Sequence, residues 1–128
     1  MTHVLDAGGV SALAADPRKV DAMLRRAEWP PQVSTAVLVE CLTGDSRRDH
    51  ATNRLLNLCQ VREVDEGTAR RAATLRTRSP RAGTISAVDA LVVALAERFE
   101  GAVVVSSDPI DMLALVGASD HPIRVLPV

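Results

Sequence analysis

The feature that most constrains the fold is a regular alternation of short apolar runs with longer helix-forming segments. The runs that predict strands are residues 3–5, 32–35, 61–64, 101–107 and 123–127. Run 101–107, GAVVVSS, is the most apolar and β-branched of them, as a central parallel strand should be. Strands that alternate with helices are typical of a parallel sheet covered by helices. The pattern therefore predicts an α/β sandwich with three layers and a central parallel sheet of about five strands.

Helix signals fill the intervals between these strands. Asp16 followed by Pro17 predicts an N-cap and a first helical position, and the Trp29–Pro31 segment is expected to end that helix. Leucines and a cysteine near the end of 45–59 give this segment an apolar side, formed by Leu55, Leu56, Leu58 and Cys59. The predicted helices are residues 9–17, 17–28, 36–44, 45–59, 66–78, 85–99 and 109–116.

Length and composition limit the class of protein. A chain of 128 residues with 47% hydrophobic residues is expected to form one folded domain, residues 1–128. Its longest apolar run, 90–96, is too short to cross a bilayer, and no signal peptide is visible at the N-terminus. Cys41 and Cys59 show no paired motif and are expected to be small core residues. These features predict a cytoplasmic protein without a membrane association.

Four carboxylates stand at unusual places. Asp6 and Asp108 directly follow two predicted strands, and ligand sites of parallel sheets form at the carboxyl ends of strands. Glu40 and Asp89 lie in otherwise apolar helices. Each acid except Glu40 also has a local explanation, since Asp6 fits a turn, Asp108 an N-cap and Asp89 a capping box with Ser86. For Glu40 the plain alternative is a helix with one solvent-exposed edge.

If these acids converge, they predict a metal site. Like charges about 5 Å apart repel by roughly 1 to 3 kcal/mol, and retained protons or a divalent cation relieve this repulsion. Carboxylate oxygens suit Mg²⁺ or Mn²⁺. Segment 67–88 contains several arginines and no acidic residue, so it is either a solvated surface or a phosphate-binding one. A carboxylate-held Mg²⁺ beside arginines favours phosphodiester hydrolysis.

Four motifs occur along the chain in the order VLDAGG, STAVLVECLTG, TISAVDALVVALA and VVVSSDPIDML. Their order and spacing resemble the PIN-domain ribonucleases, in particular the VapC-type toxins of toxin–antitoxin pairs. The resemblance implies an endoribonuclease that depends on Mg²⁺ or Mn²⁺ and cleaves structured RNA, such as transfer or ribosomal RNA. It also implies a homodimer and a cognate antitoxin.

Carried over to this sequence, the resemblance assigns the site residues one by one. The catalytic and metal-binding acids would be Asp6, Glu40, Asp89 and Asp108. Asp111 would be an additional metal ligand and Ser107 a supporting hydroxyl. Weaker RNA contacts are expected from the arginine-rich segment, at Arg76, Arg78 and Arg81.

Two alternatives remain open. The family often has Ser, Thr or Asn after its first aspartate, whereas Ala7 stands here. A PIN-like module that binds RNA and antitoxin with weak or no catalysis would also fit. A phospho-receiver domain is disfavoured, because the single lysine of the chain, Lys19, is not near the last strand.

Overall fold

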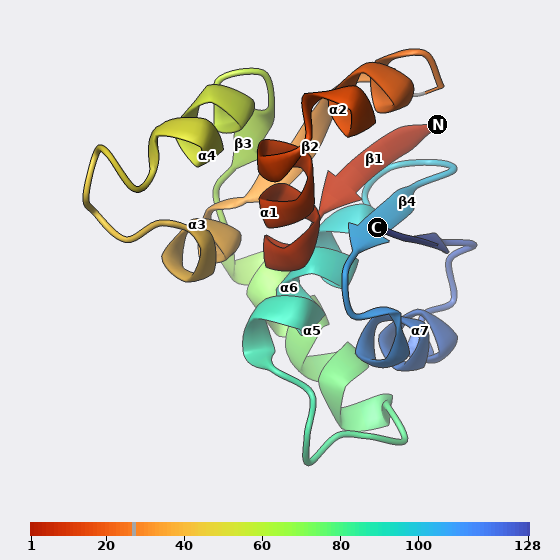
Figure 1. Ribbon diagram of the computed structural model, residues 1–128. Helices are drawn as coiled ribbons and strands as arrows, with labels where there is room; N and C mark the ends of the chain where they lie inside the picture. The colour runs from red at the N-terminus through yellow and green to blue at the C-terminus, as the bar shows by residue number, and fades with distance from the viewer. Residues whose placement is uncertain (27) are drawn as a thin grey trace.

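The computed structural model describes residues 1–26 and 28–128, and its centre is a parallel sheet (Figure 1). The strands within this part run in the spatial order β3-β2-β1-β4-β5, and each neighbouring pair is parallel. Their bounds are β1 (Thr2–Leu5), β2 (Glu28–Ser34), β3 (Gln60–Arg62), β4 (Val103–Ser106) and β5 (Arg124–Pro127). The predicted α/β sandwich with a parallel sheet is confirmed.

Helices cover both faces of the sheet. On one face α1 packs against β1 and β4, with α2 and α4 beside it, and on the other face α6 packs between α5 and α7. Helix α3 contacts both α1 and α6 and so reaches from one layer to the other. The helix bounds are α1 (Ala7–Ala15), α2 (Pro17–Leu24), α3 (Thr35–Cys41), α4 (His50–Leu56), α5 (Glu66–Arg78), α6 (Ala87–Ala96) and α7 (Pro109–Ala118).

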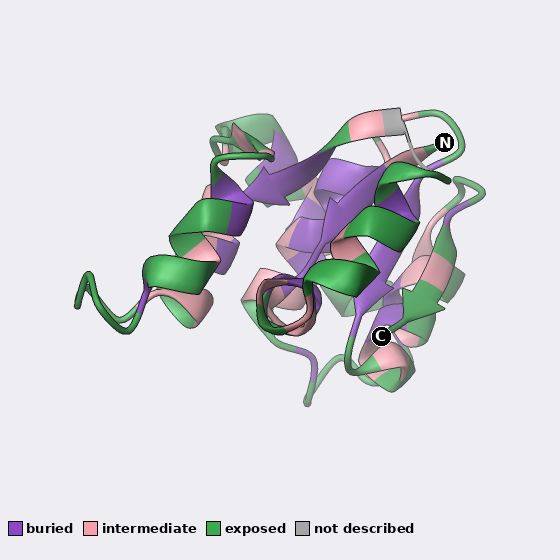
Figure 2. Ribbon diagram, turned by 45° about the horizontal axis from the view of Figure 1, so that its top comes forward, coloured by how far each residue is buried: buried purple, intermediate pink, exposed green. Residues whose placement is uncertain are grey.

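The hydrophobic core lies where the central strands meet α6. Val4 and Val104 on neighbouring strands are fully buried, and so is Val93 on α6. Each such side chain contributes about 1.5 to 3 kcal/mol through its removal from water. Figure 2 shows this buried region running through the middle of the molecule, with exposed residues around its margin. Among the described residues, no helix combines the length and apolarity that a membrane span requires.

The structure corrects the expectation that Trp29–Pro31 is a break before a strand at 32–35. These residues belong to β2, which ends at Ser34. The pairing of β2 with β1 shifts register between Thr2 and Val4, and its pairing with β3 starts only at Gln32. Prolines cannot donate to a sheet ladder, so an irregular, singly paired stretch accommodates them.

The helix expected over 45–59 is also much shorter, because α4 begins at His50. Asp49 explains the difference. Its buried carboxylate accepts hydrogen bonds from the Thr43 N–H at 2.9 Å, the Thr43 hydroxyl at 2.8 Å and the Gly44 N–H at 2.8 Å. These bonds, led by the one from the Thr43 backbone, hold the pKa of Asp49 below its ordinary value and fix a turn over 43–49.

Past the end of α4, Leu58 is 48% exposed, so its predicted place in the core is wrong. Cys41 and Cys59 are free thiols that pack, half-buried, against the core. Burial raises the pKa of both thiols, that of Cys59 to about 11. These two cysteines therefore behave as small apolar residues.

Candidate active site

Asp6 stands between β1 and α1 at the carboxyl end of the sheet. Its N–H continues the strand pairing by donating to the Val105 carbonyl at 3.2 Å, and its Oδ1 accepts from the Gly9 N–H at 2.6 Å. The side chain thus caps α1, although it is only 5% exposed as a residue. Burial raises the pKa of Asp6, and hydrogen bonds from Ser106 and Gly9 act in the opposite direction. Asp6 is a fixed, partly desolvated carboxylate.

Ser106 is a site residue that the sequence reasoning missed. This last residue of β4 is fully buried, and its hydroxyl donates to Asp6 while accepting from the Asp108 N–H at 3.0 Å. Ser107, the predicted supporting hydroxyl, is exposed. No local pattern distinguished Ser106 from Ser107, because which of the two hydroxyls lies inward depends on how the end of β4 packs.

Asp89 lies in the first turn of α6. Ser86 caps this helix, with its Oγ accepting from the Asp89 N–H at 3.0 Å, which confirms the predicted capping role of Ser86. The pKa of Asp89 is raised to about 6, first by burial and then by the negative charges of other acids. Those acids are Asp6, Glu40 and Asp111. Carboxylates from the start of α1 and from α3, α6 and α7 are therefore brought within electrostatic reach of Asp89.

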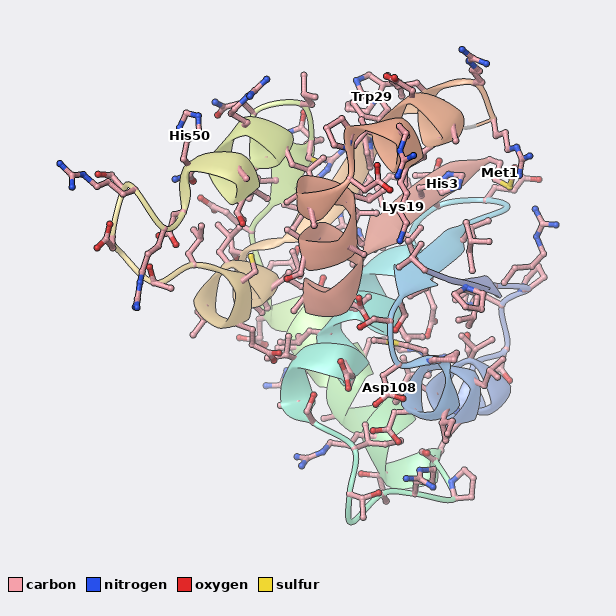
Figure 3. The ribbon with its side chains drawn as sticks, viewed as in Figure 1. Met1, His3, Lys19, Trp29, His50 and Asp108 are labelled. Atoms are coloured by element: carbon pink, nitrogen blue, oxygen red, sulfur yellow. The ribbon has the colours of Figure 1, made fainter. Side chains whose placement is uncertain are left out.

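Glu40 is exposed, so the expectation of a buried glutamate on α3 is wrong. The alternative, a helix with one solvent-exposed edge, holds. Its neighbour Val39 is 82% exposed, which places this side of α3 in solvent. Asp108 is exposed as well, at the start of α7 (Figure 3). Its side chain makes no capping hydrogen bond to the described residues, whereas its charge helps to raise the pKa of Asp6.

The three arginines predicted to contact RNA all lie at the surface near the end of α5, and each already has a partner. Arg81 Nε donates to Asp111 Oδ1 at 2.9 Å. Arg76 Nε donates to the Ile85 carbonyl at 2.8 Å, and Arg78 lies 4.0 Å from the Asp120 carboxylate. Of these arginines, Arg81 is the one bound to an acid of the predicted site.

The acids fit a hard divalent cation by their donor chemistry, because all of them offer carboxylate oxygens. Burial first, and then repulsion from the other acids, raise the pKa of Asp89, and a bound cation would offset both effects. Their present geometry is open, since no three His, Cys, Asp or Glu side chains in the described part surround a common metal position. Glu40 and Asp108 are exposed, so their side chains have room to close on an ion.

Comparison with known proteins identifies one family. The profile of one family, described as the PIN domain, matches residues 4–114. No curated protein matches the chain in sequence.

Several solved structures share the fold. A chain of the DNA-bound VapBC complex from Salmonella typhimurium aligns with a TM-score of 0.71 and 17% identity, over 99% of this chain and 98% of that one. VapC20 from Mycobacterium tuberculosis, described as a sarcin–ricin loop cleaving toxin, gives a TM-score of 0.63 and 19% identity, over 88% and 95%. A chain of FitAB bound to an IR36 DNA fragment gives 0.65 and 20%, over 97% and 94%. At these identities the likeness establishes the fold.

Proposed function

The chain belongs to the PIN domain family, and from this premise we propose that it is a metal-dependent endoribonuclease, the toxin of a toxin–antitoxin pair. The observation that carries the proposal is the gathering of acids at the carboxyl end of the sheet, where buried Asp6 and half-buried Asp89 lie within electrostatic reach of each other. Burial first, and then the charges of Asp6, Glu40 and Asp111, raise the pKa of Asp89. Charge repulsion of this kind is retained where a site is built to bind a cation.

We assign the metal to Asp6 and Asp89, with Asp108 and Glu40 completing the set and Asp111 as an additional ligand. A bound Mg²⁺ or Mn²⁺ supplies water activation and neutralises charge on the phosphate oxygens. Ser106 holds the Asp6 carboxylate and the Asp108 backbone in one arrangement. The buried strand ends make this part of the site rigid, and the exposed acids supply the adjustable part.

Structured RNA is the proposed substrate class. VapC20, which shares the fold, is described as cleaving the sarcin–ricin loop. Arg81, in the loop after α5, adds positive charge beside Asp111, and positive charge attracts a phosphate backbone.

The test is cleavage of transfer and ribosomal RNA by the purified protein, with Mg²⁺ or Mn²⁺ and with excess EDTA. Asp6→Asn and Asp89→Asn are expected to abolish cleavage and growth arrest, and EDTA to abolish cleavage by the native protein. Glu100→Gln removes one charge at an exposed position outside the site and serves as the control. Undiminished cutting by both aspartate variants in EDTA would refute the assignment.

An antitoxin is the proposed protein partner, since solved neighbours include the VapBC and FitAB complexes. We place its contact in a groove of about 330 Å³ between α1, α2 and α4, which is largely apolar. Leu13 and Leu55 form its buried wall and Leu58 its exposed rim. An amphipathic segment would cover these side chains with its apolar face.

The adjacent reading frame is the natural candidate for this partner, and co-expression tests it. Leu58→Asp is expected to weaken the complex, whereas Leu113→Asp on α7, an equally drastic change at an exposed leucine, is not. Equal retention of the partner by both variants would contradict the placement. We also propose that the protein is a homodimer, which light scattering of the purified chain would test.

A second candidate, a PIN-like module with weak or no catalysis, is favoured by the open arrangement of the acids and by Ala7. It predicts binding of RNA and of the co-expressed partner without metal-dependent turnover. The cleavage assay described for the native protein separates the two.

A further inference from the structure

The loop between α5 and α6 presents Arg81 in a fixed position. The Arg81 carbonyl accepts hydrogen bonds from the Thr84 N–H at 2.9 Å, the Ile85 N–H at 3.1 Å and the Thr84 hydroxyl at 3.0 Å. These three bonds close a turn that fixes the backbone at Arg81. From that turn, Arg81 Nε donates to Asp111 Oδ1 on α7 at 2.9 Å.

The two partners of this ion pair differ in exposure. The Arg81 side chain is 47% exposed, and the Asp111 side chain is 19% exposed. The guanidinium therefore lies at the rim, and the carboxylate lies inward, where its charge contributes to the raised pKa of Asp89. A positive charge at the rim already engages one of the acids that face Asp89.

We propose that Arg81 competes with the divalent cation for the Asp111 carboxylate and thereby lowers the metal affinity of the site. This inference rests on the proposed function, because it concerns the metal of that same site. Two effects of Arg81 both lower the metal affinity. A carboxylate oxygen bound to a guanidinium is less available as a ligand, and the guanidinium repels a dication.

The position of Asp111 makes the competition specific to Arg81. Arg76 and Arg78 come from the same stretch of chain, but they engage a carbonyl and an acid outside the cluster. Asp111 is thus both a helix-start residue and a site acid, and Arg81 decides which role its carboxylate takes.

Calorimetric titration with Mn²⁺, without RNA, tests the proposal independently of cleavage. Arg81→Gln is expected to bind Mn²⁺ more tightly by roughly three- to ten-fold, the range that Coulomb's law gives for a dication and one positive charge about a side chain apart in a water-like medium. Arg81→Lys keeps the charge and should stay closer to the native protein. In an Asp111→Asn background, the gain from Arg81→Gln should become smaller.

Arg70→Gln is the matched control. Arg70 lies near the start of α5 and pairs with Glu66 through Nε at 2.8 Å, so it loses the same charge and a similar ion pair away from the acids. Its Mn²⁺ affinity should equal that of the native protein. Thermal unfolding of each variant verifies that it is folded.

The possible outcomes distinguish failure of the Arg81 inference from failure of the proposed metal site. Native protein that binds Mn²⁺, with Arg81→Gln no tighter than Arg70→Gln, overturns the inference and leaves the proposed function intact. Weaker Mn²⁺ binding by folded Arg81→Gln also overturns the inference, and would show that Arg81 positions α7 through Asp111. Absence of Mn²⁺ binding by the native protein contradicts the proposed metal site and the inference with it.

Discussion

Replacing Asp89 by Asn should make the protein more stable, even though it should abolish catalysis. The ionised Asp89 carboxylate is half-buried and faces the charges of Asp6, Glu40 and Asp111. An asparagine has nearly the same shape, keeps the backbone N–H that donates to Ser86 Oγ, and carries no charge. The substitution therefore removes the cost of burying a charge, and the repulsion from the other acids, without opening a cavity.

The size of the effect follows from the pKa. A rise from 3.8 to about 6 corresponds to about 3 kcal/mol of native-state free energy. Because solvent screens a half-buried group, we expect a gain of about 1 to 2 kcal/mol in the free energy of unfolding at pH 8.

The gain must also depend on pH in a defined direction. The folded protein holds its Asp89 proton up to a higher pH than the unfolded chain does, so the native protein loses stability as the pH rises from about 4 to about 6. The asparagine variant does not titrate there. Its advantage should be near zero below about pH 4, should grow through this window and should be constant above it.

Urea denaturation followed by circular dichroism, in EDTA and at several pH values between 4 and 8, measures this difference. Burial lowers the pKa of His3, but His3 is present in both proteins, so its contribution cancels from the comparison. Glu100→Gln controls for the loss of one negative charge. A destabilised Asp89→Asn protein at pH 8, or a gain that is the same at every pH, would refute the reasoning.

Four further predictions concern the site and the core. Mg²⁺ should lower the pKa of Asp89, measured by carbon NMR titration of the carboxyl; an unchanged value would argue against Asp89 as a ligand. Ser106→Ala should reduce metal-dependent cleavage and shift its pH profile, whereas Ser107→Ala should leave the profile in place, because Ser106 contacts Asp6. Gly9→Ala directs a methyl group against the Val105 carbonyl and should lower stability by about 1 to 3 kcal/mol in thermal denaturation, with Gly67→Ala as the uncrowded control. Leu75→Ala on α5, at a fully buried position, should lower the free energy of unfolding by about 2 to 5 kcal/mol in urea; a loss below 1 kcal/mol would show that the core collapses around it.

Local signals in the sequence determined much of the fold. The helix expected at 66–78 has the bounds of α5, and Asp65 caps it by accepting from the Thr68 N–H at 2.7 Å. The valine-rich strand β4 before Asp108 lies inside the sheet, between β1 and β5, as its composition predicts. Helix caps and apolar runs depend on residues that are close in the chain, so they can be recognised from the sequence alone.

The same reasoning placed Asp6 and Asp108 at strand ends, because a parallel sheet gathers the carboxyl ends of its strands at one edge. It could not decide which side chains are buried there. Glu40 is exposed because α3 packs on α1 and α6 with only part of its surface.

Contacts between distant segments were decided by the tertiary structure. The prolines of β2 are tolerated because of a register shift against β1, and α4 starts late because Asp49 binds Thr43 and Gly44. Arg81 meets Asp111 across 30 positions of the chain. The sequence by itself determined the alternation of strands and helices and that acids follow the strands, but not where β2 and α4 begin. Only packing determined which acids are desolvated, because burial and pairing depend on groups that no local pattern brings together.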